Sequence, residues 1–158
     1  MKKLILTAVL LLIVSSLSFG QSAQVTATVN AVISVTTDAN LVFGNVVKGV
    51  PKTVLSTEAN AAAFTITAEP STPTVLTVTF PSNLVNGANN LPFTGETPVY
   101  NSTQTQTGAT AYGSLTGGTA STNASGNLYV YIGGTVSPAV NQASGNYSGT
   151  INVSVVYP

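Results

Sequence analysis

The sequence has no cysteine, histidine, tryptophan or arginine, and these absences exclude several kinds of chemistry. A chain without cysteine forms no disulfide and offers no thiolate nucleophile. A chain without histidine lacks the side chain that most often serves as a general base or a zinc ligand near neutral pH. We therefore expect no enzyme activity, no cofactor and no metal site.

Charge is also scarce, since charged residues make up only 5% of the sequence. Beyond residue 20 the cations are Lys48 and Lys52. The acidic residues are Asp38, Glu58, Glu69 and Glu96. Binding to phosphate backbones needs clusters of Lys and Arg, so nucleic acid is excluded as a natural partner. The four carboxylates are too scattered to predict a catalytic pair or a calcium site.

A surface with so little charge must be covered by Ser, Thr, Asn, Gln and Gly. Charged side chains are a main protection against edge-to-edge pairing of strands, and this surface has few of them. We interpret this as an indication that the strand edges of the folded protein are occupied.

The start of the chain has the pattern of a secretory signal peptide, residues 1–20. Lys2 and Lys3 precede a nearly unbroken apolar run over residues 4–14, and small and polar residues follow. Cleavage is expected after Gly20, or alternatively after Ala23. The run is too short to span a bilayer as a helix, which takes about 20 residues. The pattern predicts a secreted protein with no membrane span after removal of the signal.

In the rest of the chain the apolar residues do not recur with the spacing of an amphipathic helix. Alternating runs rich in Val, Ile, Thr and Phe recur between Gly, Pro and Asn turns, which is typical of β-strands. Strands are expected at residues 41–47, 53–57, 61–68, 74–80, 91–94, 99–101 and 128–132, besides two terminal runs. Asn86-Gly87 is the strongest hairpin signal. We predict one domain over residues 21–158, an all-β, antiparallel, immunoglobulin-like β-sandwich of about seven to eight strands.

The first terminal run lies at residues 21–35, where Val25, Ala27 and Val29 alternate with threonines. The second lies at residues 145–158 and reads G-N-Y-S-G-T-I-N-V-S-V-V-Y-P. Successive side chains of a strand point to opposite faces, so both runs predict half-buried strands. A regular terminal strand either closes a sheet or pairs with another chain. The residues expected to carry pairing in the second run are Gly145, Tyr147, Ile151, Val153, Val155 and Tyr157.

The second run resembles the terminal motif of chaperone–usher pilus subunits. Gly145 is the fourteenth residue from the end, Tyr157 is the penultimate residue, and alternating apolar residues lie between them. The wider stretch 126–157, with L-V-F-G-N-V-V at 41–47, is similar to a family of small secreted bacterial domains without a characterised function. That family is grouped with Mat/Ecp-type fimbrillins and spore-coat-protein-U-like domains. The resemblance covers roughly half the mature chain.

The resemblance implies a pilin-like structural subunit of a fimbria or pilus, joined by β-strand complementation and aiding adhesion. Residues 21–35 are then a donor strand for the groove of a neighbouring subunit, or else the first strand of the sandwich. The implied partners are further copies or related pilus subunits, a periplasmic chaperone and an outer-membrane usher. The implied location is the periplasm in transit, then the cell surface or fimbrium.

Two other functions stay open. One is a monomeric secreted or surface-coat β-sandwich. The other is a carbohydrate-binding adhesin module. It would use the polar stretch 102–127, which is expected to be a loop or a weak edge strand, or the outward pair Tyr129 and Tyr131.

Overall fold

The computed structural model describes residues 21–158, so the expected signal peptide lies outside the described residues. The described chain folds into strands without any helix. In order they are β1 (Ser34–Ala39), β2 (Lys52–Val54), β3 (Ala62–Thr67), β4 (Pro73–Thr79), β5 (Asn83–Asn86), β6 (Asn89–Gly95), β7 (Val99–Asn101), β8 (Thr110–Ala111), β9 (Thr116–Ser121), β10 (Asn127–Ile132), β11 (Gly134–Val136) and β12 (Asn152–Val156). Within residues 21–158 there is accordingly no helix long and apolar enough to cross a lipid bilayer.

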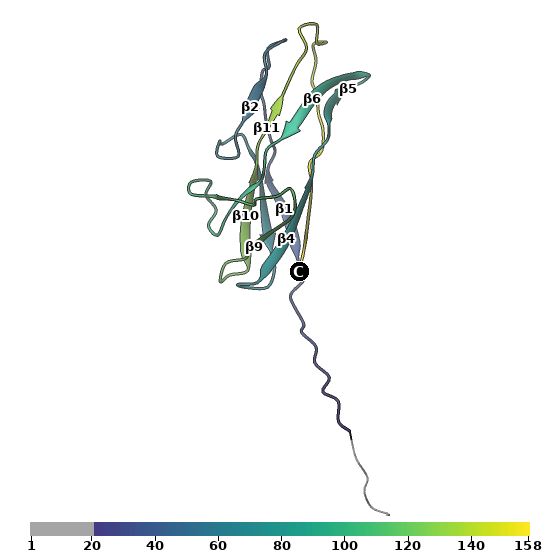
Figure 1. Ribbon diagram of the computed structural model, residues 1–158. Helices are drawn as coiled ribbons and strands as arrows, with labels where there is room; N and C mark the ends of the chain where they lie inside the picture. The colour runs from purple at the N-terminus through teal and green to yellow at the C-terminus, as the bar shows by residue number, and fades with distance from the viewer. Residues whose placement is uncertain (1–20) are drawn as a thin grey trace, which may run out of the picture.

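The strands pair antiparallel in three sheets, which confirms the predicted all-β sandwich (Figure 1). Two sheets, β1-β3-β10-β7-β8 and β12-β4-β9, make the lower half of the molecule in Figure 1. The third, β2-β11-β6-β5, makes the upper half. The molecule is therefore elongated, with one end at the β3–β4 and β9–β10 loops and the other beyond β2 and β11.

Alternation places the core as the sequence predicts. In β3, Phe64 and Ile66 are buried between more exposed threonines, and in β4 Leu76 and Val78 are buried in the same way. Val130 of β10 joins them in the main cluster between the two lower sheets. A second, smaller cluster of Leu91, Phe93 and Val136 fills the upper half.

The chain has twelve strands within the described residues, more than the seven to eight predicted. One cause is Gly133, which separates β10 from β11 and lets the chain pass from a lower sheet into the upper one. A side chain at Gly133 would collide with Glu96 and the backbone around Val54 and Ser56. Another cause is the polar stretch 102–127, which contributes β8 and β9 despite its lack of large apolar residues.

Four predicted strands differ from the structure. The strand predicted at residues 53–57 is reduced to β2, which ends at Val54. Residues 41–47 bend at Asn45, where Gly44 has a φ of 61°, and they join no ladder. The closing strand is shorter than its alternation predicts, because only β12 pairs continuously, with β4. The run 21–35 pairs only from Ser34 onward, with β3. Alternation alone could not reveal where pairing stops, because pairing depends on which segments distant in sequence lie beside the strand.

Candidate functional site

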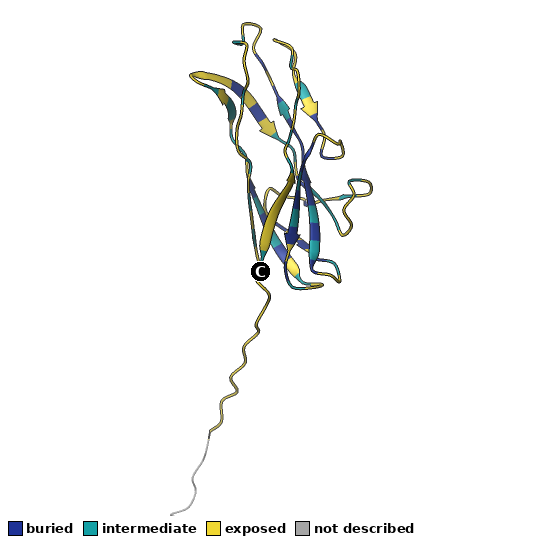
Figure 2. Ribbon diagram, turned by 180° about the vertical axis from the view of Figure 1, so that it is seen from behind, coloured by how far each residue is buried: buried dark blue, intermediate teal, exposed yellow. Residues whose placement is uncertain are grey.

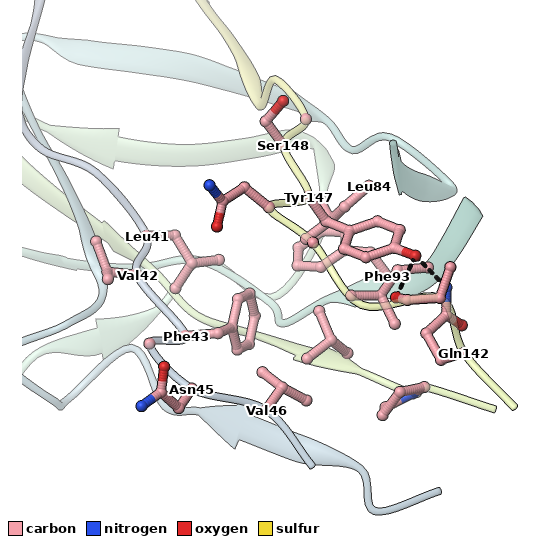
Figure 3. Close-up of a pocket in the computed structure, with 18 of the residues that line it drawn as sticks. Leu41, Val42, Phe43, Asn45, Val46, Leu84, Phe93, Gln142, Tyr147 and Ser148 are labelled. Carbon is pink, nitrogen blue, oxygen red and sulfur yellow. Dashed lines mark hydrogen bonds between the residues drawn. The ribbon is translucent and has the colours of Figure 1, made fainter. Parts of the chain in front are cut away.

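An open groove runs along one side of the sandwich, between residues 41–46 and residues 143–151 (Figure 3). Its larger part has a volume of about 680 Å³. Apolar side chains from both walls and from β5, β6 and β11 line this part, namely Leu41, Phe43, Val46, Leu84, Leu91, Phe93, Val136, Tyr147 and Ile151. A cleft with this apolar lining is suited to an extended apolar ligand.

The groove continues toward β1 as a second cavity of about 430 Å³. Thr37 and Ala39 of β1 lie on one side of it, and Thr150 lies on the other. The two cavities share Leu41, Gly149 and Ile151 in their linings, so they are parts of one elongated groove.

Backbone hydrogen bonds hold each wall of the groove to a neighbouring segment on the side away from the groove. The Val42 amide donates to the Asn60 carbonyl (2.9 Å), and Ser148 exchanges both backbone hydrogen bonds with Val85 (2.8 and 3.0 Å). No backbone ladder joins the two walls anywhere in residues 21–158. The inner edges of both walls therefore face each other without a strand between them, which leaves strand-pairing groups available.

The floor of the groove is firmly packed. Phe93 makes edge contacts with Phe43 (6.1 Å between ring centroids) and with Phe80 (5.9 Å). On the opposite wall the Tyr147 hydroxyl donates to the Ala143 carbonyl (2.8 Å) and accepts from the Gln142 side-chain amide (2.7 Å), as the dashed lines in Figure 3 show. These contacts keep the groove open and shaped in the absence of an occupant.

Residues 21–30, called the extension below, project from the lower end of the molecule and are exposed throughout (Figure 2). Val25 and Val29 are each 92% exposed. Their alternation with Thr26, Thr28 and Asn30 gives the extension one apolar face that nothing in its own domain covers. An unpaired alternating strand of this kind is a ready template for pairing with another sheet edge.

Ala31, where the extension meets the domain, is fixed on both sides. Its amide donates to Glu69 Oε2 (3.0 Å), and its carbonyl accepts from the Tyr157 hydroxyl (2.7 Å). The same hydroxyl accepts a hydrogen bond from the Glu69 amide (2.9 Å). This three-residue clamp of Ala31, Glu69 and Tyr157 sets the point at which the extension leaves the fold.

The structure distributes the predicted strand-pairing residues over four places. Gly145, Tyr147 and Ile151 line the groove. Val153 and Val155 lie in β12 and pack, half-buried, against the main core. Tyr157 belongs to the clamp. The remaining three, Val25, Ala27 and Val29, lie on the extension and away from the groove of their own chain.

Sequence reasoning missed the rest of the groove. The run 41–47 carries the signal for one wall, because five of its seven side chains are apolar. Leu84 and Phe93, from the β5–β6 hairpin, carry no such signal. No sequence pattern indicated a role for Glu69, because that role depends on contacts with residues distant in sequence.

Glycines shape the wall formed by residues 143–151. Gly145 has a φ of 149°, and a Cβ there would collide with the Asn86 side chain. Gly149 is equally constrained, because a Cβ there would lie 2.8 Å from Leu84 Cδ2 and 3.1 Å from Pro81 Cγ. Both glycines thus allow a close approach to the β5–β6 hairpin.

The carboxylates take part in local structure. Besides Glu69 in the clamp, Glu96 Oε2 accepts from the Ser56 amide (2.7 Å) and Glu58 Oε2 from the Leu55 amide (3.0 Å). Asp38 accepts from the Thr65 hydroxyl (2.6 Å). No group of three or more possible metal-ligating side chains occurs among the described residues.

Shifted pKa values occur away from the groove. Burial raises the pKa of Tyr131, with smaller contributions from Asp38 and Tyr129. Burial also raises the pKa of Tyr112, whose hydroxyl has no hydrogen-bond partner. These shifts follow from the burial of phenol rings in the core.

The surface considered for carbohydrate binding is less open than its composition indicates. Tyr131 is buried, so it does not form an exposed aromatic pair with Tyr129. Gln106, in the polar stretch 102–127, is tied back by hydrogen bonds from its side-chain amide to the carbonyls of Ser56 (3.2 Å) and Glu58 (2.7 Å).

A family model described as Domain of unknown function (DUF4402) matches residues 11–157. No curated protein matches the chain.

Proposed function

The chain belongs to the DUF4402 family, whose description gives the function as unknown. From the groove and the extension of this chain we propose that it is a structural subunit of a fimbria-like surface assembly. In this proposal the extension of one copy fills the groove of the next copy. The observation that carries it is that one chain holds both an open groove without a central strand and an unpaired strand without a sheet.

The chemistry of the two parts is complementary. A strand in the groove would find backbone partners on the inner edges of both walls and an apolar floor beneath. The apolar face of the extension would bury Val25 and Val29, and full burial of a valine contributes about 1.5–3 kcal/mol. Strand addition of this kind derives affinity from the backbone and register from side chains that fill pockets.

Complementation between copies is favoured over filling of the chain's own groove. Ala31 is held on both sides by the clamp, and Ile33 packs against the core. To reach its own groove the extension would have to reverse direction at residues 31–33, which read A-V-I. A reversal there would break the hydrogen bonds that hold the Ala31 amide and carbonyl.

An open apolar groove is also a hazard before assembly, because exposed strand edges promote aggregation. We therefore include in the proposal a periplasmic chaperone that covers the groove during export, and an outer-membrane usher that delivers subunits to the cell surface. The resemblance of the C-terminal run to chaperone–usher subunits supports these partners.

The test is deletion of residues 21–29 from the mature protein. We expect a folded monomer with an unchanged thermal midpoint that no longer polymerises, because these residues are exposed in the free subunit. The intact chain at equal concentration is the reference, and sedimentation measures assembly. A deletion variant that unfolds would make the segment an ordinary first strand, and an intact chain that stays monomeric at the cell surface would favour the coat-domain alternative.

A further inference from the structure

We propose that consecutive copies also touch end to end, through an apolar patch at the upper end of one domain and the loop surface at the lower end of the next. The upper surface, called the tip, comprises residues 47–50 and 138–141. The lower surface, called the base, comprises residues 69–72 and 122–126. This inference rests on the proposed function and adds a second contact surface to it.

The tip exposes aliphatic side chains on two loops that lie together. Val47, Val50 and Val140 are 68%, 55% and 83% exposed. The Gly49 amide donates to the Ala139 carbonyl (3.1 Å), and a Cβ at Gly49 would lie 2.9 Å from Val140 Cγ1. Three exposed valines on adjoining loops form a patch, in contrast to single exposed apolar residues, which need no explanation.

The tip adjoins one end of the groove. Val46 and Lys48 line the groove on one wall, and Pro138 and Gln142 line it on the other. A strand that leaves the groove at this end passes beside the two tip loops, which the hydrogen bond between Gly49 and Ala139 joins to each other. The tip patch is therefore continuous with the surface that the extension is proposed to occupy.

The extension leaves the domain at the opposite end, beside the base (Figure 1). The two base loops are joined by hydrogen bonds from the Ala68 amide to the Gly126 carbonyl (2.8 Å) and from the Ser71 amide to the Asn123 carbonyl (3.0 Å). Pro70 and Ala124 are exposed there, which gives the base apolar atoms of its own. The clamp holds Ala31 next to this surface through Glu69.

Lengths leave no room for a linker between two copies. The extension, residues 21–30, spans about 33 Å when extended, at about 3.3 Å per residue. An extension that enters the groove at the tip has residue 30 there, and the next residue, Ala31, is already fixed at the base of its own domain.

The direction of the chain fits this arrangement. When neighbouring copies share one orientation, an extension enters at the tip with residue 30 there and residue 21 deeper in the groove. It then runs parallel to β1 and antiparallel to β12. The charges of the two surfaces are also complementary. The two lysines of the described chain, Lys48 and Lys52, lie at or beside the tip, whereas Glu69 lies at the base.

The experiment compares two measurements on tip variants of the full mature chain. The first is the critical concentration for assembly of Val47→Ser/Val140→Ser. We expect it to rise about tenfold, the factor that corresponds to about 1.4 kcal/mol. Leu55→Ser, which removes a 46% exposed aliphatic side chain outside the tip, is the matched control and should stay within about twofold.

The second measurement is the Kd of a labelled peptide with the sequence of residues 21–30. The acceptor is the chain carrying Val25→Asp and Val29→Asp, whose own extension cannot donate, with and without the tip substitutions. We expect the tip substitutions to leave this Kd within about twofold, because the peptide lacks the base surface that would contact the tip.

Two results would overturn the end-to-end contact: an unchanged critical concentration, or a peptide Kd that rises by the same factor as the critical concentration. In the second case the valines would act on the groove and not on a neighbouring base. A peptide that binds neither acceptor would instead refute the proposed function itself, so the two failures are distinguishable.

Discussion

The hydroxyl of Tyr157 donates a hydrogen bond to the carbonyl of Ala31 across 126 positions of sequence, at 2.7 Å. This bond joins the two terminal runs whose alternation is the most regular in the chain. Tyr157 thereby holds the extension at the point where it leaves the fold. Other residues of the same C-terminal segment line the groove.

Tyr157→Phe should lower assembly more than it lowers the stability of the free subunit. The change removes the hydrogen bonds to Ala31 and from Glu69, so only the bond from the Ala31 amide to Glu69 Oε2 still holds the extension where it leaves the fold. We expect a loss of about 1 kcal/mol in the free energy of unfolding. The polymerised fraction should fall several-fold, measured by sedimentation beside thermal unfolding. Tyr129→Phe, on a half-buried tyrosine of β10, is the control, and equal assembly by both variants would contradict a role for the clamp.

Gly145→Ala should distort the groove wall. It places a side chain against Asn86 at a φ of 149°, where L-residues are rarely found. Gly108→Ala is a matched control, because its φ of 75° is also unfavourable but its Cβ would meet nothing within 4 Å. Binding of the peptide 21–30 should weaken at least tenfold for Gly145→Ala and stay within about twofold for Gly108→Ala. Equal weakening would indicate that backbone strain alone, and not the contact with Asn86, decides the effect.

Phe64→Ala should destabilise the free subunit by about 3–5 kcal/mol, through lost transfer energy and a cavity in the main core. Ile151→Ala should cost less in the free subunit, because Ile151 is only half-buried and lines the groove. Thr79→Ala, on the exposed face of β4, should stay within about 1 kcal/mol. Chemical denaturation at one pH compares all three, and a loss for Thr79→Ala as large as that for Phe64→Ala would contradict the register.

Much of this core follows from sequence. Alternation over β3, β4 and β10 identifies the buried faces, because these strands pair with and pack against segments of the same chain. Alternation cannot tell whether a strand finds its partner in the same chain, so residues 41–47 and the extension were predicted as strands or possible donors without their pairing. The clamp and the groove floor depend on contacts across distant segments, which a single sequence does not display.

Above about pH 10 the subunit should lose stability through Tyr112. Burial raises the pKa of this phenol above its ordinary value of 10.0. The unfolded chain therefore releases the proton first, and the free energy of unfolding falls as pH rises, by up to about 1.4 kcal/mol per pH unit. Below pH 10 the phenol is neutral in both states and contributes no slope.

Tyr112→Phe keeps the ring packed on Tyr100, whose centroid lies 4.7 Å away, and removes only the unpartnered hydroxyl. Urea denaturation at pH 8 and pH 11 should show a smaller alkaline loss for this variant than for the intact chain. An identical loss in both proteins would exclude Tyr112 as the cause and leave Tyr131, whose pKa burial also raises.

A disulfide between two chains shows whether the extension of one copy fills the groove of another. The native sequence has no cysteine, so a chain with Val25→Cys can be mixed with a chain carrying Leu84→Cys in the groove. Thr26→Cys, on the opposite face of the extension, replaces Val25→Cys in the control. On non-reducing gels after mild oxidation we expect crosslinked dimers for Val25→Cys and several-fold fewer for Thr26→Cys. Equal yields from the two positions, or no crosslink from either, would contradict this proposal.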